Sequence, residues 1–417
     1  MTEYKRFELL DGVFLTAVRT DACAVSCMSM TLLTQLTRET AALNAVLPAV
    51  LRRGSSRLPD NAAIDAALAE MGGAEILPTV RKLGELQAVG LLATFPHTAF
   101  QRMAQELTVM LLAPNTRGGL LRPDWVKAEA AALTERISSA QEDAPDHARR
   151  RLIEGMCCCE DFALSEFGDA ESAESIFYQK LTRHYHDLLQ KSPLEIFYLG
   201  TEAPRSVAQV LAELLVTMPR GEPDDELGTD VRMNSLESEP RTVRESLPEQ
   251  AEASIAVGWR LGDQMEDPDP AALRMLEACL RQMLKAALAP ETRVSLDLHK
   301  GLLLLDAPLR TTAETALEII HAQLGLLAAE ALPEETRSAA LAESEAQLLT
   351  AAQDAAKAER FWIERAPLGL LYSPEELLGL LQEVTPADIA ASARSLECDM
   401  VYVCTPEPDD EIETTEA

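Results

Sequence analysis

The sequence is poor in basic residues relative to acidic ones. Its 417 residues include 37 Lys and Arg against 68 Asp and Glu, which gives a formal net charge of −31 at pH 7. A protein that binds nucleic acid or an anionic membrane needs clustered Lys and Arg to neutralise phosphates. The charge balance therefore argues against either as the main partner and is typical of an acidic protein of the cytoplasm.

Long hydrophobic runs are also missing. No stretch approaches the roughly 18 apolar residues of a membrane-spanning helix, and the N-terminus Met-Thr-Glu-Tyr-Lys-Arg-Phe-Glu lacks the basic-then-apolar order of a signal peptide. We therefore expect a cytoplasmic protein. Because 47% of the residues are hydrophobic, a largely disordered chain is excluded, and the length predicts two or three domains.

Cysteine and histidine are too scattered to predict a metal centre. The eight cysteines include no Cys-x-x-Cys pair, and their one cluster is Cys157 to Cys159. Consecutive helical residues point about 100° apart, so these thiols are predicted to be buried rather than to share a metal. The same divergence argues against a metal site at His184 and His186. No nucleophile elbow, Walker loop or dinucleotide fingerprint is present.

The best-marked helix of the sequence lies between Thr40 and Gly54. Apolar residues at positions 43, 46, 47, 50 and 51 have the spacing of a helix buried along one face. Thr40 is a candidate N-cap, and Gly54 with the following Ser55 is a stop signal. Pro48 in the interior should cost roughly 3 kcal/mol unless the helix bends. We expect a bend there, or an unsatisfied carbonyl near Asn44.

Strand-like and helical segments occur in two halves with a similar order. The first half contains strand-like segments within 7–36 and at 74–80, 87–95 and 194–200, and helical segments at 61–71, 99–112, 124–139, 147–166, 176–190 and 206–217. The second contains strand-like segments at 253–260, 293–298, 301–305 and 400–404, and helical segments at 271–288, 312–331, 333–366, 374–384 and from Thr385.

This order predicts an α+β fold made of two duplicated halves, each an antiparallel sheet with helices packed on one face. The halves are expected at residues 1–220 and 251–405. Residues 221–250, rich in Pro, Gly, Ser and acidic residues, are interpreted as an acidic linker that joins the halves into a clamshell, and 406–417 as an acidic tail.

Several short motifs lie close to the best-marked helix in the sequence. It leaves through Arg53-Gly54-Ser55, the pair Pro59-Asp60 follows, and a strand begins at Gly73-Ala74. A later helix carries Glu129. In this arrangement the sequence resembles the insulinase/pitrilysin-type metallopeptidases over nearly its whole length. In that family the motif helix carries the inverted zinc motif His-x-x-Glu-His.

The resemblance also locates what has been lost. Counting back from Gly54 places Ala45 and Ala49 at the two His ligands and Pro48 at the catalytic Glu, and Arg136 stands where the third zinc ligand is expected, seven residues after Glu129. Methyl groups and a pyrrolidine ring offer neither a lone pair for zinc nor a titratable group for base catalysis. We therefore expect no catalytic residue, no metal site and no cofactor in this chain.

Peptide binding does not require the catalytic residues and is therefore possible without catalysis. The family binds its substrate as an added strand on the sheet edge that begins near Gly-Ala, which here implies Ala74, Glu75, Ile76 and Leu77 as peptide-binding residues. Pro78 removes one backbone donor from this edge, and an ordinary edge strand is an equally good interpretation. The Arg and Tyr with which the family's second half holds the substrate have no counterpart in the sequence around 278–305.

Within the family, the resemblance is closest to the degenerate member of bacterial pairs in which a sister chain keeps the zinc motif. Mitochondrial processing peptidase, with one catalytic and one degenerate subunit, is an analogous case. It implies a catalytically inactive homologue that forms a heterodimer with an active, zinc-bearing subunit and helps to enclose a peptide or unfolded segment. The alternative hypothesis is a stand-alone or homodimeric peptide-binding or scaffold protein without a peptidase partner. An enzyme with a novel site is the third.

Overall fold

Both halves of the sequence contribute to each of two structural units. The structure is a computed structural model that describes residues 3–141, 144–222, 227–231, 239–247 and 252–406. Unit 1 consists of Met1–Ala140, Leu164–Thr229 and Ala346–Leu377, and unit 2 of Gln141–Ala163, Asp230–Glu345 and Leu378–Ala417. The first predicted half therefore contributes residues 141–163 to unit 2, and the second contributes residues 346–377 to unit 1.

The described part of unit 1 is built on a six-stranded sheet in the order β1-β2-β8-β3-β5-β4. Its strands are β1 (Glu3–Leu10), β2 (Val13–Arg19), β3 (Ser26–Gln35), β4 (Glu75–Leu83), β5 (Leu86–Phe95) and β8 (Leu194–Gly200). Strands β2 and β8 run parallel, and the other neighbours are antiparallel. Strands β1 and β4 form the two edges.

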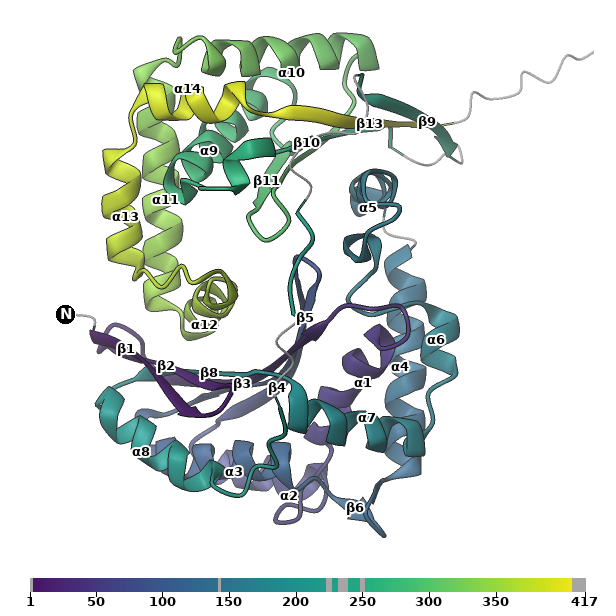
Figure 1. Cartoon of the computed structure of the whole chain (residues 1–417), viewed down its shortest axis with the longest axis vertical. Helices are drawn as coiled ribbons and strands as arrows, with labels where there is room; N and C mark the ends of the chain where they lie inside the picture. Colours follow the sequence, from purple (N-terminus) through teal and green to yellow (C-terminus); the bar gives the residue numbers. More distant parts are fainter. Residues whose placement is uncertain (1–2, 142–143, 223–226, 232–238, 248–251, 407–417) are drawn as a thin grey trace, which may run out of the picture. The chain divides into compact units, whose positions relative to one another are not determined.

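Helices cover both faces of this sheet. Figure 1 shows α1, α3 and α8 on one face and α12 on the other. The helices of the unit are α1 (Ala41–Arg52), α2 (Asn61–Glu70), α3 (Phe100–Leu112), α4 (Pro123–Gln141), α6 (Ala170–Glu174), α7 (Tyr178–Lys191), α8 (Pro204–Leu215) and α12 (Ala355–Ile363), and a small hairpin joins β6 (Thr116–Arg117) to β7 (Leu120–Leu121). A strand covered on both faces is mostly apolar and is buried throughout, as all seven residues of β8 are. Its one charged residue, Glu195, pairs with Arg6 at 2.7 Å.

Unit 2 repeats this plan with five described strands in the order β11-β12-β10-β13-β9. They are β9 (Arg241–Leu247), β10 (Ser254–Arg260), β11 (Arg293–Asp297), β12 (Leu302–Pro308) and β13 (Glu397–Pro406). Helix α5 (Ala144–Met156) packs on one face, through Ala148, Leu152 and Met156. Helices α9 (Pro270–Ala287), α10 (Ala313–Ala328) and α14 (Pro386–Arg394) lie on the other (Figure 1).

The predicted α+β class with two similar halves is confirmed, but two details of it were wrong. Each sheet contains one parallel pair, β2 with β8 and β9 with β13. Each sheet also has a helix on its second face, α12 in unit 1 and α5 in unit 2. Both corrections have the same origin, because these strands and helices pair with or pack on partners far away in the sequence.

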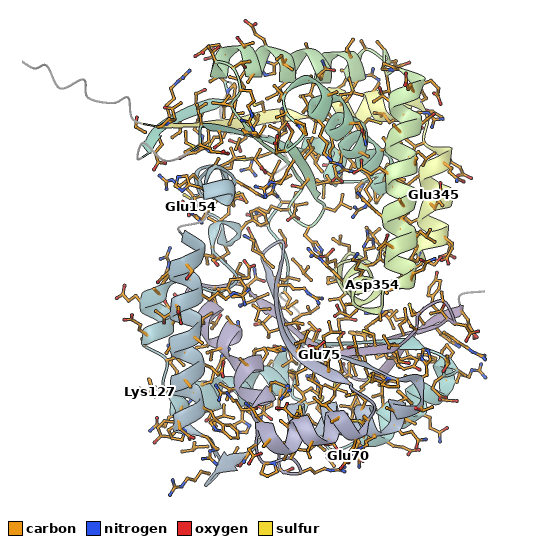
Figure 2. All side chains as sticks on the ribbon, turned by 180° about the vertical axis from the view of Figure 1, so that it is seen from behind. Glu70, Glu75, Lys127, Glu154, Glu345 and Asp354 are labelled. Atoms are coloured by element: carbon orange, nitrogen blue, oxygen red, sulfur yellow. The ribbon has the colours of Figure 1, made fainter. Side chains whose placement is uncertain are left out.

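Three predicted segments have different bounds in the structure. The predicted helix 333–366 is two helices, α11 (Glu334–Gln353) and α12, because Asp354 accepts hydrogen bonds from the amides of Ala356 and Lys357 and so begins a new helix. Figure 2 labels Asp354 at this point. The predicted helix 147–166 ends at Met156, and the predicted linker contains strand β9. Helix α13 (Pro374–Glu383) matches its prediction closely.

Candidate functional site

Helix α1 has the buried character that its sequence predicts. Ten of its twelve residues are buried, and Pro48 lies inside the helix. Thr40 is the residue that precedes the helix, but its hydroxyl lies 2.7 Å from the Thr37 hydroxyl and makes no capping bond. At the other end, a Cβ on Gly54 would lie 2.7 Å from the Pro59 carbonyl oxygen and 2.8 Å from the Trp125 ring. Only glycine therefore fits where the chain leaves α1.

The positions that correspond to zinc ligands hold no zinc donor. Ala45 is 7% exposed and Ala49 is half-buried, while Pro48 is buried beside them. Arg136 is exposed on α4, with its guanidinium 3.9 Å from the centre of the Phe167 ring. Two methyl groups, a pyrrolidine ring and a guanidinium do not fit a zinc ion, which takes nitrogen, sulfur or oxygen lone pairs.

A groove of about 440 Å³ opens beside Ala49. It is lined by Ala49, Arg52, Arg53, Asn61, Asp65, Pro78 and Glu129. Arg53 Nε donates to Glu129 Oε1 at 2.6 Å, and Arg52 pairs with Asp65 at 3.3 Å. The carboxylate of Glu129, which the sequence matches to the first Glu of the family's later helix, is thus held by a guanidinium. The groove retains charges, but they neutralise one another.

A second polar cluster on α1 is enclosed. The side-chain amide of Asn44, which is fully buried, donates to Gln87 Oε1 at 2.8 Å, and the Gln87 amide donates to the carbonyls of Ala41 and Glu166 at 3.0 and 2.6 Å. Asn44 Oδ1 accepts from His184 Nε2 at 2.5 Å. Since the Asn44 oxygen can only accept, His184 carries its proton on Nε2.

Burial lowers the pKa of His184 to about 4, so this ring is neutral at pH 7. The sequence treated His184 and Asn44 separately because 139 residues lie between them. The signal available was one polar residue inside each of two apolar runs, Leu43-Asn44-Ala45 and Leu86-Gln87-Ala88. A buried polar side chain nearly always has a hydrogen-bond partner. Each of these residues therefore indicated a polar contact with another part of the chain.

The edge strand β4 contains the predicted peptide-binding residues Ala74 to Leu77. It is an edge of its sheet, as expected, with Glu75 and Leu77 exposed and Ile76 buried. Figure 2 labels Glu75 near the start of the strand. Ile76 O accepts from Arg52 Nε at 2.9 Å, so the backbone groups of Ile76 point away from β5.

Residues that alternate with Ile76 along β4 point their backbone groups in the same direction. Pro78 is one of these, and it has no N–H to donate. The amide of Ala74 already donates to Leu68 O at 3.2 Å. Three backbone positions of the outer edge are therefore committed or lost, and a peptide added there would find fewer partners than on an ordinary edge strand.

The histidines and cysteines named in the sequence analysis lie in different surroundings. Within the described ranges there is no group of three or more His, Cys, Asp or Glu that could hold a metal ion. His184 is part of the enclosed network, whereas His186 is exposed. The prediction of buried thiols was wrong for two positions, because Cys158 and Cys159 are exposed. They lie in a turn after α5, where helical spacing does not apply.

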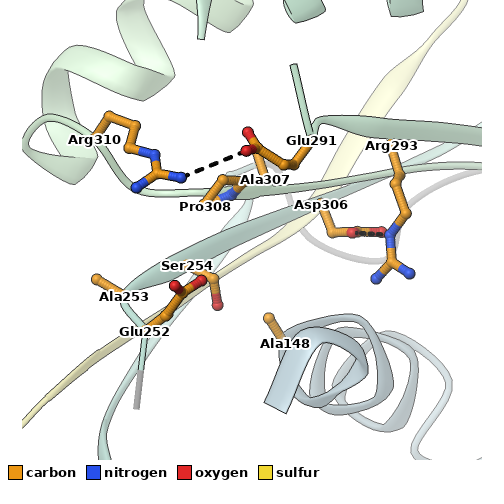
Figure 3. A pocket seen from close by; sticks show the side chains of 10 residues that line it. All are labelled: Ala148, Glu252, Ala253, Ser254, Glu291, Arg293, Asp306, Ala307, Pro308 and Arg310. Atoms are coloured by element: carbon orange, nitrogen blue, oxygen red, sulfur yellow. Dashed lines mark hydrogen bonds and ion pairs between the residues drawn. The ribbon is translucent and has the colours of Figure 1, made fainter. Parts of the chain in front are cut away.

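Unit 2 contains a pocket of about 370 Å³ at the ends of β10 and β12 (Figure 3). Asp306 accepts from Arg293 Nε at 2.6 Å and from Arg149 at 3.2 Å, and Arg310 lies 3.6 Å from Glu291. Figure 3 shows the Arg293–Asp306 and Arg310–Glu291 pairs on the pocket wall. Four charged lining residues pair in this way, Glu291, Arg293, Asp306 and Arg310, and none of the predicted site residues lines the pocket.

Comparison with known proteins finds similarity over nearly the whole chain. No family model matches the sequence. Over 412 residues the chain is 21% identical to the probable inactive metalloprotease YmfF of Bacillus subtilis (strain 168), a match that covers 94% of this chain and 95% of that protein. In the described part of the chain, no helix is both long and apolar enough to cross a membrane.

Two solved structures share the fold. A conserved protein from Enterococcus faecalis V583 superposes with a TM-score of 0.80 at 19% identity, covering 97% of this chain and 99% of that one. A peptidase M16 inactive domain from Pseudomonas fluorescens superposes with a TM-score of 0.76 at 14% identity, covering 97% and 99%. The fold is thus shared over 97% of this chain, whereas the residues at the positions that the resemblance assigns to zinc are not zinc ligands.

Proposed function

The chain is an inactive relative of the insulinase-type metallopeptidases, as its sequence predicted, and from this premise we propose that it is the non-catalytic subunit of a heterodimeric peptidase. Its partner is a homologue that carries His-x-x-Glu-His and binds the zinc ion, while this chain helps to enclose the peptide. We propose that the pair acts in the cytoplasm.

One observation carries this proposal. The fold of a peptidase M16 inactive domain is shared over 97% of the chain, with a buried core in each unit, while Ala45, Pro48, Ala49 and Arg136 stand where the resemblance expects the chemistry. A fold kept without its catalytic groups is expected where its surface and shape serve another subunit. The groove beside Ala49 also supports a non-catalytic role, because its two Arg and two carboxylate side chains balance one another without a metal ion.

Peptide contact is proposed at the N-terminal part of β4, from Ala74 to Leu77. The exposed side chains of Glu75 and Leu77 are available to an added strand. Such a strand must take the Ile76 carbonyl from Arg52 and cannot use a donor at Pro78. Peptide binding by this chain alone is therefore expected to be weak and to depend on the partner subunit.

A tagged pull-down from the native cytoplasm tests the subunit proposal, with partners identified by mass spectrometry and sized by chromatography. The expected result is a stoichiometric homologue that carries His-x-x-Glu-His. Recovery of only this chain, at monomer or homodimer size, would overturn the proposal and favour the stand-alone peptide-binding or scaffold role.

The peptide contact is tested by fluorescence anisotropy with a labelled, unstructured basic decapeptide, which the acidic chain should favour. Pro78→Thr supplies the missing outward donor, and Arg52→Ala releases the Ile76 carbonyl, so each should tighten binding several-fold. Arg57→Ala is the matched control, since Arg57 pairs with Glu106 away from this edge. Unchanged or weaker binding in both variants would argue against strand addition at β4.

A further inference from the structure

Two exposed thiols lie side by side in the turn that follows α5. Cys158 and Cys159 are both exposed, and their sulfur atoms are 3.7 Å apart. Cys157, directly before them, is fully buried, and burial raises the pKa of its thiol to about 12. The three consecutive cysteines thus divide into one enclosed thiol and one accessible vicinal pair.

The backbone on both sides of the pair is fixed to the interior of unit 2. The Cys157 amide donates to Ile153 O and the Glu160 amide to Cys157 O, both at 2.9 Å. Arg260 donates to Met156 O at 3.1 Å.

Glu160 holds the far side of the turn through two cations. Its carboxylate lies 3.2 Å from the Arg260 guanidinium and 2.7 Å from Lys300 Nζ, and all three side chains are at most 3% exposed. A buried ion-pair network of this kind resists rearrangement, because breaking it leaves an uncompensated charge. The turn therefore keeps the two sulfur atoms close to each other.

We propose that Cys158 and Cys159 form a reversible thiol modification site that is oxidised to a vicinal disulfide by low-molecular-weight disulfides. The thiolate of one cysteine attacks the oxidant, forms a mixed disulfide and releases one small thiol. The second cysteine then attacks the protein sulfur and expels the second small thiol. The two protein thiols lose two electrons and two protons, and the oxidant disulfide is reduced to two thiols.

The product would be labile. The Cα atoms of adjacent residues are about 3.8 Å apart, below the usual disulfide range of about 4.4 to 6.8 Å, so the closed ring is strained. Strained, exposed disulfides are readily reduced, and accessible thiols with a neighbouring resolving cysteine are typical redox sites. The site therefore belongs to the reversible class of cysteine oxidation and not to structural disulfides.

The test uses the native full-length chain with oxidised glutathione, followed by alkylation and peptide mass spectrometry. In the wild type, the peptide that contains both cysteines should become lighter by two hydrogens and lose both alkylation sites, and dithiothreitol should restore them. The buried Cys279 is the internal control and should be alkylated only after denaturation.

Two variants separate the steps. Cys159→Ser should accumulate a glutathione adduct at Cys158, and Cys158→Ser should accumulate one at Cys159, because neither retains a resolving thiol. A stable glutathione adduct in the wild type, a disulfide between two chains, or full alkylation of both residues after oxidation would each overturn the proposal.

Discussion

Helix α1 and the residue that follows it, Arg53, contribute to two polar clusters that differ in burial and in charge. Asn44 belongs to an enclosed, neutral network with Gln87 and His184, whereas Arg53 pairs with Glu129 at an open groove. A buried hydrogen bond is costly to break because its partners lose water and gain nothing, but a partly exposed ion pair is replaced by solvation at little cost.

This difference bears on which substitutions the fold can tolerate. Residues at the open groove beside Ala49 contribute little to stability, so the fold tolerates changes there. Substituting a residue of the enclosed network leaves its buried partners without hydrogen bonds and so destabilises the fold. The predictions below test whether the two clusters differ in this way.

The largest effect is expected from Asn44→Ala. The substitution leaves the His184 N–H and the Gln87 oxygen buried without a partner, at about 1 to 3 kcal/mol each, so the free energy of unfolding should fall by about 4 kcal/mol. Urea denaturation measures it. Asn61→Ala, at the groove rim, is the matched control and should change stability by less than about 0.5 kcal/mol. Equal effects of the two substitutions would remove the contrast between the clusters.

A pH dependence of stability is expected next. The pKa of His184 is about 4 in the folded chain and 6.5 when unperturbed. Between these values the unfolded chain binds more protons, so stability is complete above pH 6.5 and falls as the pH drops towards 4, by about 3 kcal/mol.

The variant His184→Gln tests this sign, because Gln can still donate to Asn44 but does not titrate. Denaturation between pH 4 and 7 should show that the wild type loses more stability on acidification than the variant. His186→Gln, on the exposed neighbour, should behave like the wild type. Parallel curves for the wild type and His184→Gln would contradict the neutral network.

The smallest effect concerns the pair at the groove. The side chains of Arg53 and Glu129 are 34% and 16% exposed, so a double-mutant cycle with Arg53→Ala and Glu129→Ala should give a coupling of about 1 kcal/mol or less that decreases in high salt. A coupling above about 3 kcal/mol, as buried pairs show, would mean that the groove is as essential to the fold as the core.

Sequence reasoning located the site better than it located the contacts around it. Periodicity and Gly54 placed α1 correctly, because these signals lie within a few residues of one another. The polar network was missed because Asn44, Gln87 and His184 meet only in the folded chain. Strand β9 was missed for the same reason, since its pairing with β13 overrides an unfavourable local composition.

The two covering helices show another limit. The break at Asp354 was hidden because its alanine-rich surroundings favour one continuous helix, and α12 is positioned by contacts such as Arg81 to Glu359, 278 residues apart. The end of α5 at Met156 depends in part on Arg260, which holds its carbonyl. No pattern within either segment contains this information.

The most direct test of the central claim, that this chain has given up its zinc site, is the metal content of the purified protein. The chain is equilibrated with zinc, dialysed against zinc-free buffer and analysed by mass spectrometry for metal per chain. With Ala45, Ala49 and Arg136 at the ligand positions, we expect no stoichiometric zinc. One tightly held zinc ion per chain, together with a peptidase activity that a chelator removes, would contradict the account.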